Sequence, residues 1–283
     1  MKLLSFLTPT RSTFGVVDGD RVIDMGVRLG ATCPDLKSAL QSGQLERIER
    51  LARGAPADHR LDEIRFLPPL PNPGRIVCIG LNYVAHRAEG GHKTAAPAPV
   101  TFLRLPESQV GHGEALRCPR ESHQFDYEAE LAVVIGKVGR RIAEADAWSH
   151  VAGISCYNDG SVRDWQLLTG QWSPGKNFPA TGAFGPWLVT PDEVDPARSL
   201  RLSCRLNGET MQDTTTDLMM FPIPALIAFV STWTTLEVGD VIVTGTPGGV
   251  GARRTPPLWM KPGDKVEIEI DKVGILENSI ADG

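Results

Sequence analysis

The chain lacks the features of a disulfide framework, a zinc knuckle, a membrane protein or a nucleic-acid-binding protein. Its five cysteines are scattered, and none belongs to a Cys-x-x-Cys pair. No run approaches the roughly 18 apolar residues that a membrane-spanning helix needs. The net charge of −5 gives no electrostatic reason to expect a nucleic-acid partner. Because Pro9 and Arg11 end the apolar N-terminal stretch too early for a signal peptide, we expect a cytoplasmic protein with neither nucleic-acid nor membrane partners.

The sequence also lacks the common signatures of nucleotide-binding proteins and serine hydrolases. The glycine-rich stretch 244–251, Thr-Gly-Thr-Pro-Gly-Gly-Val-Gly, matches neither the P-loop nor G-x-G-x-x-G. Neither H-E-x-x-H nor G-x-S-x-G is present. Nucleotide binding and a Ser-His-Asp mechanism are therefore not supported.

The composition, 22% charged and 41% hydrophobic, is that of an ordinary globular protein, and 283 residues can hold one large domain or a large domain with a small appendage. Residues 1–65 are predicted to form a small N-terminal α/β domain, with a hairpin at the Asp-Gly turn and helical spacing over 34–52. Residues 66–75 are predicted to be a linker, because closely spaced prolines exclude a helix or a central strand. Residues 76–283 are left as the catalytic domain.

Strand signals dominate the predicted catalytic domain, and only residues 143–150 and 223–233 have the character of helices. The regular β-α-β alternation of a Rossmann fold or barrel is missing. We therefore expect a mixed α+β, strand-dominated fold. The expected strands lie between Gly, Pro and Asp turns, at 75–80, 131–135, 187–190, 200–206, 241–244 and 265–270.

Three acidic residues indicate a metal site. Glu128 and Glu130 stand two apart, just before the apolar run 131–135, so on a strand they share one face. Two carboxylates side by side repel each other unless a positive charge lies between them. With Asp159 as a third ligand they would form an all-oxygen site for Mg²⁺ or Mn²⁺. The alternative is a solvated acidic strand whose glutamates meet surface lysines.

Three further stretches carry polar residues of the kinds that active sites use. His86 and Glu89 are one helical turn apart, so the carboxylate can orient the imidazole as a general base, and the glycines that follow would let this turn move as a lid. The alternative is an incidental surface pair. Arg163 and Gln166 could bind substrate oxygens, or simply belong to a solvated helix start. Lys176, in a Gly/Pro loop, could stabilise an enolate oxygen.

In this order, these stretches resemble the fumarylacetoacetate hydrolase family from about Ile76 to Glu277. One such motif would be weak evidence, but seven in series are highly specific. They are Gly-Leu-Asn-Tyr-x-x-His-x-x-Glu (80–89), Asp-Tyr-Glu-Ala-Glu-Leu (126–131), Asn-Asp-x-Ser-x-Arg-Asp-Trp-Gln (158–166), Gly-Lys-x-Phe (175–178), Gly-Pro-Trp (185–187), Asn-Gly-Glu (207–209) and Gly-Asp-Val-Ile-x-Thr-Gly-Thr-Pro-x-Gly-Val-Gly (239–251).

The resemblance implies a mixed β-sandwich or β-roll, usually a homodimer, that acts on small 2-oxo acids. It implies that Mg²⁺, or Mn²⁺ or Ca²⁺, is held by three acidic ligands and that water is activated by a lid dyad. The residues that fall on these positions are Glu128, Glu130 and Asp159 for the metal; His86, Glu89 and Lys176 for catalysis; and Tyr83, Arg104, Arg163, Gln166 and Thr246 for the substrate.

Two departures from the family pattern bear on substrate identity. Arg104 stands where many relatives have lysine, which suggests a different grip on an anionic end, because arginine prefers planar, bidentate contacts. The stretch 177–180, Asn-Phe-Pro-Ala, replaces the commoner Ser-Phe-Asp and could reshape the pocket wall beside Lys176.

We first expect a metal-dependent hydrolase that cleaves the C–C bond of an acylpyruvate or other 2,4-dioxo acid through a stabilised enolate, as in aromatic catabolism. The alternative is a decarboxylase or isomerase of a 2-oxo diacid, such as oxaloacetate or an aromatic ring-cleavage intermediate. Both reactions use the same electron sink, so the fold alone does not choose between them. A non-catalytic binding protein is a third hypothesis, against which the intact acidic trio and His–Glu pair count.

Overall fold

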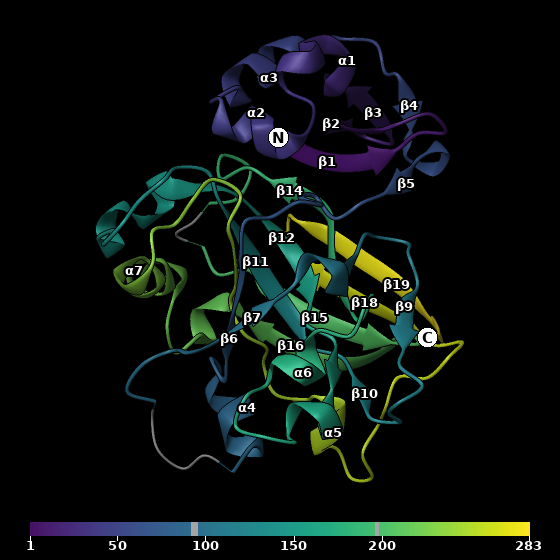
Figure 1. Ribbon diagram of the computed structural model, residues 1–283, viewed down its shortest axis with the longest axis vertical. Helices are drawn as coiled ribbons and strands as arrows, with labels where there is room; N and C mark the ends of the chain where they lie inside the picture. The colour runs from purple at the N-terminus through teal and green to yellow at the C-terminus, as the bar shows by residue number, and fades with distance from the viewer. Residues whose placement is uncertain (92–95, 196–197) are drawn as a thin grey trace.

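The computed structural model describes residues 1–91, 96–195 and 198–283. The first part of the chain is a strand hairpin covered by short helices (Figure 1). The sequence predicts one helical stretch over 34–52, whereas the structure has two helices, because Gly43 takes a left-handed conformation (φ +65°) that ends the first. The elements are β1 (Lys2–Leu7), β2 (Ser12–Asp18), β3 (Arg21–Asp24), α1 (Met25–Leu29), η1 (Gly30–Thr32), α2 (Leu36–Gln41), α3 (Leu45–Ala52), β4 (His59–Arg60), η2 (Leu61–Glu63) and β5 (Arg65–Phe66).

The N-terminal hairpin continues the main sheet. Strand β1 pairs antiparallel with β14 (Gly182–Val189), so the strand order runs β4-β3-β2-β1-β14-β12-β11-β17-β6-β7. The boundaries predicted for the N-terminal domain and linker stay predictions. The other strands of this path are β6 (Ile76–Gly80), β7 (Val100–Arg104), β11 (Ala129–Ile135), β12 (Val151–Asn158) and β17 (Val241–Val243), while β8 (Gln109–Val110) pairs with β14 off the path.

A second sheet packs on the middle of the first and has the order β16-β15-β18-β19-β9. Its strands are β9 (Leu116–Cys118), β15 (Arg201–Leu206), β16 (Glu209–Thr215), β18 (Lys265–Ile270) and β19 (Gly274–Asp282). The remaining elements are a two-stranded pair, β10 (Phe125–Asp126) and β13 (Ser161–Val162), and the helices α4 (Val84–Glu89), η3 (Pro106–Ser108), η4 (Glu144–His150), α5 (Arg163–Gln166), α6 (Ser173–Lys176), η5 (Thr216–Leu218), α7 (Ile223–Trp233) and η6 (Gly251–Arg253).

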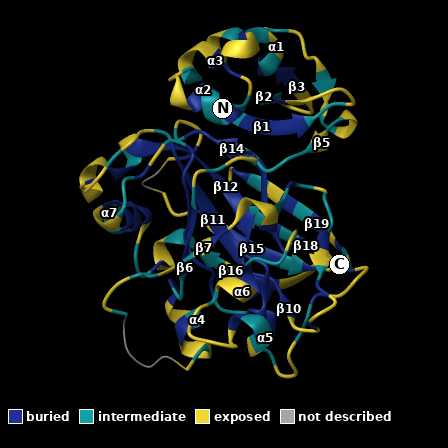
Figure 2. Cartoon of the chain, in the orientation of Figure 1, coloured by how far each residue is buried: buried dark blue, intermediate teal, exposed yellow. Residues whose placement is uncertain are grey.

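Strand β11 is buried along its whole length and separates two hydrophobic cores (Figure 2). Its side chains alternate, because successive residues of a strand face opposite sides of the sheet. Leu131 and Val133 pack into the core shared with the second sheet, whereas Ala132 and Val134 face the core shared with the N-terminal helices. The predicted strand-dominated, mixed α+β fold is confirmed.

The helices that carry most of the polar motifs gather at one end of the molecule. Helices α4, α5 and α6 lie at the bottom of the view in Figure 1, and the N-terminal hairpin lies at the top. Within the described ranges, none of the helices is long and apolar enough to cross a membrane.

Candidate metal centre and catalytic cavity

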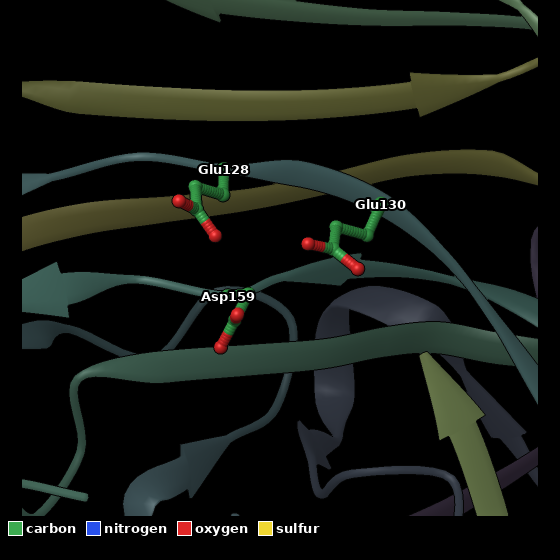
Figure 3. Close-up of side chains that lie close together, drawn as sticks. All are labelled: Glu128, Glu130 and Asp159. Carbon is green, nitrogen blue, oxygen red and sulfur yellow. The ribbon is translucent and has the colours of Figure 1, made fainter. Parts of the chain in front are cut away.

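The three predicted acidic ligands converge at the ends of two paired strands. Strand β11 runs antiparallel to β12, with Ala129 opposite Asn158. The backbone N–H of Asp159 donates to the carbonyl of Glu128 at 2.9 Å, which fixes the two residues side by side. Figure 3 shows the carboxylates of Glu128, Glu130 and Asp159 facing one space, and one oxygen of each lies within 4.8 Å of the others. All three are buried, so the alternative of a solvated acidic strand does not hold.

Two of these carboxylates share a lysine, and the third does not. The Nζ of Lys176 lies 2.7 Å from Glu128 and 2.6 Å from Asp159. Glu130 accepts the backbone N–H of Gly245 at 2.6 Å and forms no ion pair within the part of the chain that the structure describes. Burial, and then the charges of Asp159 and Glu128, raise the pKa of Glu130 well above its usual value. A buried all-oxygen donor set with one uncompensated carboxylate fits a hard divalent cation.

The carboxylate of Glu128 is held in its charged form. Burial opposes its ionisation, but Lys176 and Arg163 outweigh that effect and hold its pKa far below the usual range. Arg163 Nη1 lies 2.7 Å from Glu128 Oε1 and donates to Gln166 Oε1 at 2.9 Å, while its Nε donates to Asp126 at 2.8 Å. The two predicted substrate-binding residues Arg163 and Gln166 thus stand together beside the metal centre.

Arg104 lies behind the metal centre, and this position does not support its predicted contact with the substrate. Its side chain has no exposed surface, and Nη1 lies 2.5 Å from Asp159 Oδ1. The same guanidinium donates to the Gly160 carbonyl at 3.0 Å and to the Thr181 hydroxyl at 3.1 Å. The planar, multidentate contact expected of an arginine is present, but it is made to the carboxylate of a candidate metal ligand.

Replacing Arg104 by lysine is expected to weaken Mn²⁺ binding by about ten- to a hundredfold, because lysine keeps the charge but cannot bind Asp159, Gly160 and Thr181 at once. Titration calorimetry with Mn²⁺ measures this change. The control is Arg117→Lys. Arg117 is exposed and donates to the Asp282 carbonyl, where β9 pairs with β19. Unchanged Mn²⁺ affinity in Arg104→Lys would contradict an orienting role.

Tyr83 is likewise placed away from the cavity wall. Its side chain is almost fully buried, and its hydroxyl has no hydrogen-bond partner among the described residues. Burial, followed by the negative charge of Glu130, raises the pKa of this hydroxyl. Its predicted contact with the substrate stays a prediction.

A cavity of about 390 Å³ is lined by two of the three acidic residues, and its volume is within the usual range of small-molecule sites. Part of its wall is charged, with Glu128, Glu130, Arg163 and Lys176. Much of the rest of the wall is apolar, and sequence reasoning missed it, because its residues come from strands and loops that are far apart in the sequence. Its members include Ile79, Leu81, Phe102, Trp172, Val250 and Trp259, and the polar residues Gln124 and Arg253 were also missed.

The predicted His–Glu pair forms beside this cavity. His86 lines the cavity, and its Nδ1 lies 3.6 Å from Glu89 Oε2. Glu89 Oε1 accepts the backbone N–H of Gly249 at 2.7 Å, which attaches α4 to the loop 244–251. Glycine is required at 249, where φ is +101° and a Cβ would lie 2.3 Å from the Met211 carbonyl. The predicted proximity is confirmed, and the motion of α4 as a lid stays a prediction.

Thr246 also lines the cavity, and its hydroxyl is held on two sides. It donates to the Ala129 carbonyl at 3.0 Å and accepts from Gln212 Nε2 at 2.9 Å. Gln212, which sequence reasoning also missed, in turn accepts the backbone N–H of Ala129 at 2.9 Å. Strand β16 therefore fixes both the start of β11 and the glycine-rich loop.

Comparison with known proteins assigns the fold and the site to a family. Residues 75–281 match the family model described as fumarylacetoacetate (FAA) hydrolase, C-terminal. The chain belongs to the fumarylacetoacetate hydrolase family. A mitochondrial oxaloacetate tautomerase of Xenopus laevis is 44% identical over 219 residues, covering 77% of this chain and 68% of that protein. An oxaloacetate tautomerase of Bacillus subtilis (strain 168) is 42% identical over 225 residues, covering 78% of this chain and 75% of that protein.

Solved structures of the same family superpose over the whole chain. A fumarylacetoacetate hydrolase from Exiguobacterium antarcticum is 33% identical with a TM-score of 0.83, and coverage is 100% of both chains. A maleylpyruvate hydrolase from Sphingobium sp. SYK-6, solved with manganese(II) and pyruvate, is 29% identical with a TM-score of 0.83 and the same coverage. The protein is thus an enzyme of the fumarylacetoacetate hydrolase family. The names of its relatives favour our alternative, a decarboxylase or isomerase of a 2-oxo diacid, over the acylpyruvate hydrolase that we expected first.

Proposed function

We propose that this enzyme is a divalent-metal-dependent isomerase that interconverts the keto and enol forms of a 2-oxo diacid such as oxaloacetate. The observation that carries this proposal is that Glu128 and Glu130 of the buried acidic trio line one small cavity together with Lys176 and His86. Such a site can stabilise negative charge on an oxygen and move one proton, which is all that tautomerisation requires. The names of the relatives in Xenopus and Bacillus support the same reaction.

Glu128, Glu130 and Asp159 would hold the cation, with Mg²⁺ as our first choice and Mn²⁺ or Ca²⁺ as alternatives. When bound, the ion supplies Lewis-acid polarisation of the substrate's 2-oxo group. Lys176 contributes a fixed positive charge beside this position. Burial opposes that charge, but Asp159 and Glu128 outweigh the effect and raise the pKa of Lys176, so the ammonium form persists. It stabilises the oxygen on which negative charge develops.

His86 is proposed to carry the proton. Its Nδ1 faces Glu89, which leaves Nε2 to take a proton from C3 of the substrate. The C3–H electron pair then forms the C2–C3 double bond, and the carbonyl π electrons move to the oxygen. Return of the proton from Nε2 to that oxygen gives the enol, and the reverse order gives the ketone. No water is consumed, so the step balances without a co-reactant.

Replacement of His86 by glutamine is expected to lower kcat for oxaloacetate tautomerisation by about a hundredfold, because the proton carrier is lost. The metal ligands are untouched, so Mn²⁺ affinity is expected to stay unchanged. Loss of the enol absorbance and exchange of the C3 protons in D₂O, both corrected for the uncatalysed rate, measure the reaction. Tautomerisation that continues at the wild-type rate in His86→Gln would remove His86 from the mechanism.

Hydrolysis of an acylpyruvate is the second candidate, and the His86–Glu89 pair favours it because such a pair could instead deprotonate a water molecule. A metal-replete assay distinguishes the reactions by scoring enol–keto exchange, pyruvate and carbon dioxide separately on oxaloacetate and on a panel of 2,4-dioxo acids. Rapid pyruvate release from a dioxo acid, with no acceleration of exchange in oxaloacetate, would overturn the isomerase proposal. Tight Mn²⁺ binding with turnover of neither class would indicate a binding protein.

A further inference from the structure

Among the described residues, three arginine or lysine side chains line the cavity, and two of them already contact protein carboxylates. Arg163 contacts Asp126 and Glu128, and Lys176 contacts Glu128 and Asp159. The third, Arg253, lies on η6 at the exposed side of the cavity. Within the described ranges its guanidinium takes part in no ion pair. It is therefore the basic group of the wall that is free to meet an anionic part of a ligand.

The segment that carries Arg253 is fixed by the same buried carboxylate that holds Arg163. Asp126 accepts the backbone N–H groups of Gly251 and Ala252 at 2.8 and 2.9 Å, and the Arg163 Nε at 2.8 Å. Glycine is needed at 251, because a Cβ there would lie 1.9 Å from the Leu258 carbonyl. The turn is thus preorganised at a set position relative to the metal centre, as a recognition element should be.

The buried charges around the acidic trio indicate how many substrate carboxylates this part of the cavity can accept. Four buried carboxylates (Asp126, Glu128, Glu130 and Asp159) face three buried cations (Arg104, Arg163 and Lys176). A divalent ion therefore leaves an excess of one positive charge, which a single substrate carboxylate balances. A second carboxylate has no counter-charge around the acidic trio and would meet one in Arg253.

We propose that Arg253 binds the distal carboxylate of a 2-oxo diacid and thereby selects diacids over 2-oxo monoacids of the same length. This inference rests on the proposed function, since it places the 2-oxo acid end of the substrate at the acidic trio. Glu89, at the end of α4, is an ionisable group whose carboxylate is favoured by the positive charge of Arg253. A role through Glu89 would change proton transfer and hence kcat, whereas binding of the distal carboxylate changes KM and Kd.

The test is Arg253→Gln, assayed with two matched pairs of ligands. Oxaloacetate and 2-oxobutanoate are compared by turnover, and 2-oxoglutarate and 2-oxopentanoate by calorimetry on the Mn²⁺-loaded protein. Each pair differs in having a distal carboxylate or a methyl group. The variant is expected to raise KM or Kd for the diacids about tenfold, with kcat and the monoacid values unchanged. Because Arg253 is exposed, the wild-type preference for diacids is expected to shrink as salt is added.

Arg50→Gln on α3 is the matched control, since it removes an equal charge from an exposed arginine in the N-terminal part of the chain. A diacid-to-monoacid ratio that is the same in Arg253→Gln and wild type would overturn the proposal, as would a fall in kcat with unchanged KM. The calorimetric pair separates this result from failure of the proposed function. Diacid-selective binding that depends on Arg253 supports the inference even where oxaloacetate is not turned over. Binding without such a dependence on Arg253 refutes the inference.

Discussion

Glu130→Gln is expected to abolish divalent-cation binding and to lower kcat/KM by about a thousandfold. Glu130 is buried, and its carboxylate forms no ion pair within the described part of the chain, so a bound cation is the partner that it needs. Glutamine has the same shape and can still accept the Gly245 N–H, but it brings no charge to the ion. Loss of Lewis-acid polarisation removes several kcal/mol of transition-state stabilisation, which corresponds to the expected fall in rate.

The same substitution is expected to stabilise the metal-free protein by about 1–2 kcal/mol, because a carboxyl group whose ionisation is opposed by burial and by the charges of Asp159 and Glu128 is replaced by a neutral amide. Chemical denaturation with and without Mn²⁺ measures both effects. The metal should stabilise the wild type but leave Glu130→Gln unchanged. Glu114→Gln is the control, since Glu114 pairs with Arg65, neither residue lines the cavity, and the loss of this pair should leave the Mn²⁺ effect intact. Equal stabilisation of Glu130→Gln by Mn²⁺ would contradict the assignment of Glu130 as a ligand.

The architecture could be predicted in outline because hydrophobic patterns are local. The continuous apolar run of β11 indicates a strand buried on both faces, and the structure has that strand between two cores. The extension of the main sheet by β1 could not be predicted, because the pairing of Lys2 with Val189 joins residues far apart in the sequence. The break between α2 and α3 was missed, because the helical spacing continues across Gly43.

The acidic trio was predictable because spacing along one strand places Glu128 and Glu130 on the same face and because the family motif supplies Asp159. The contact by which Arg104 holds Asp159 could not be predicted. An arginine in a motif shows that an anion is recognised, but the sequence does not reveal whether that anion is a substrate or Asp159, as it is for Arg104. Arg253 was missed for the related reason that its position depends on the buried contacts of Asp126.

Lys176→Met is expected to lower kcat/KM by about a thousandfold and to destabilise the metal-free protein by about 3 kcal/mol. The Nζ of Lys176 lies between the carboxylates of Glu128 and Asp159, and its removal leaves two buried charges without this partner. The loss of rate follows because the variant lacks the fixed positive charge beside the oxygen that becomes negative. Steady-state kinetics on oxaloacetate and urea denaturation measure the two effects.

The response to metal distinguishes Lys176→Met from Glu130→Gln. A divalent ion at the acidic trio offsets the charges that Lys176 leaves behind, so Mn²⁺ is expected to stabilise Lys176→Met more than it stabilises the wild type. In Glu130→Gln the effect of Mn²⁺ should instead vanish. Lys261→Met is the control, because Lys261 is exposed and contacts Asp264 away from the cavity. A smaller Mn²⁺ effect in Lys176→Met than in the wild type would show that the ion does not share Glu128 and Asp159 with this lysine.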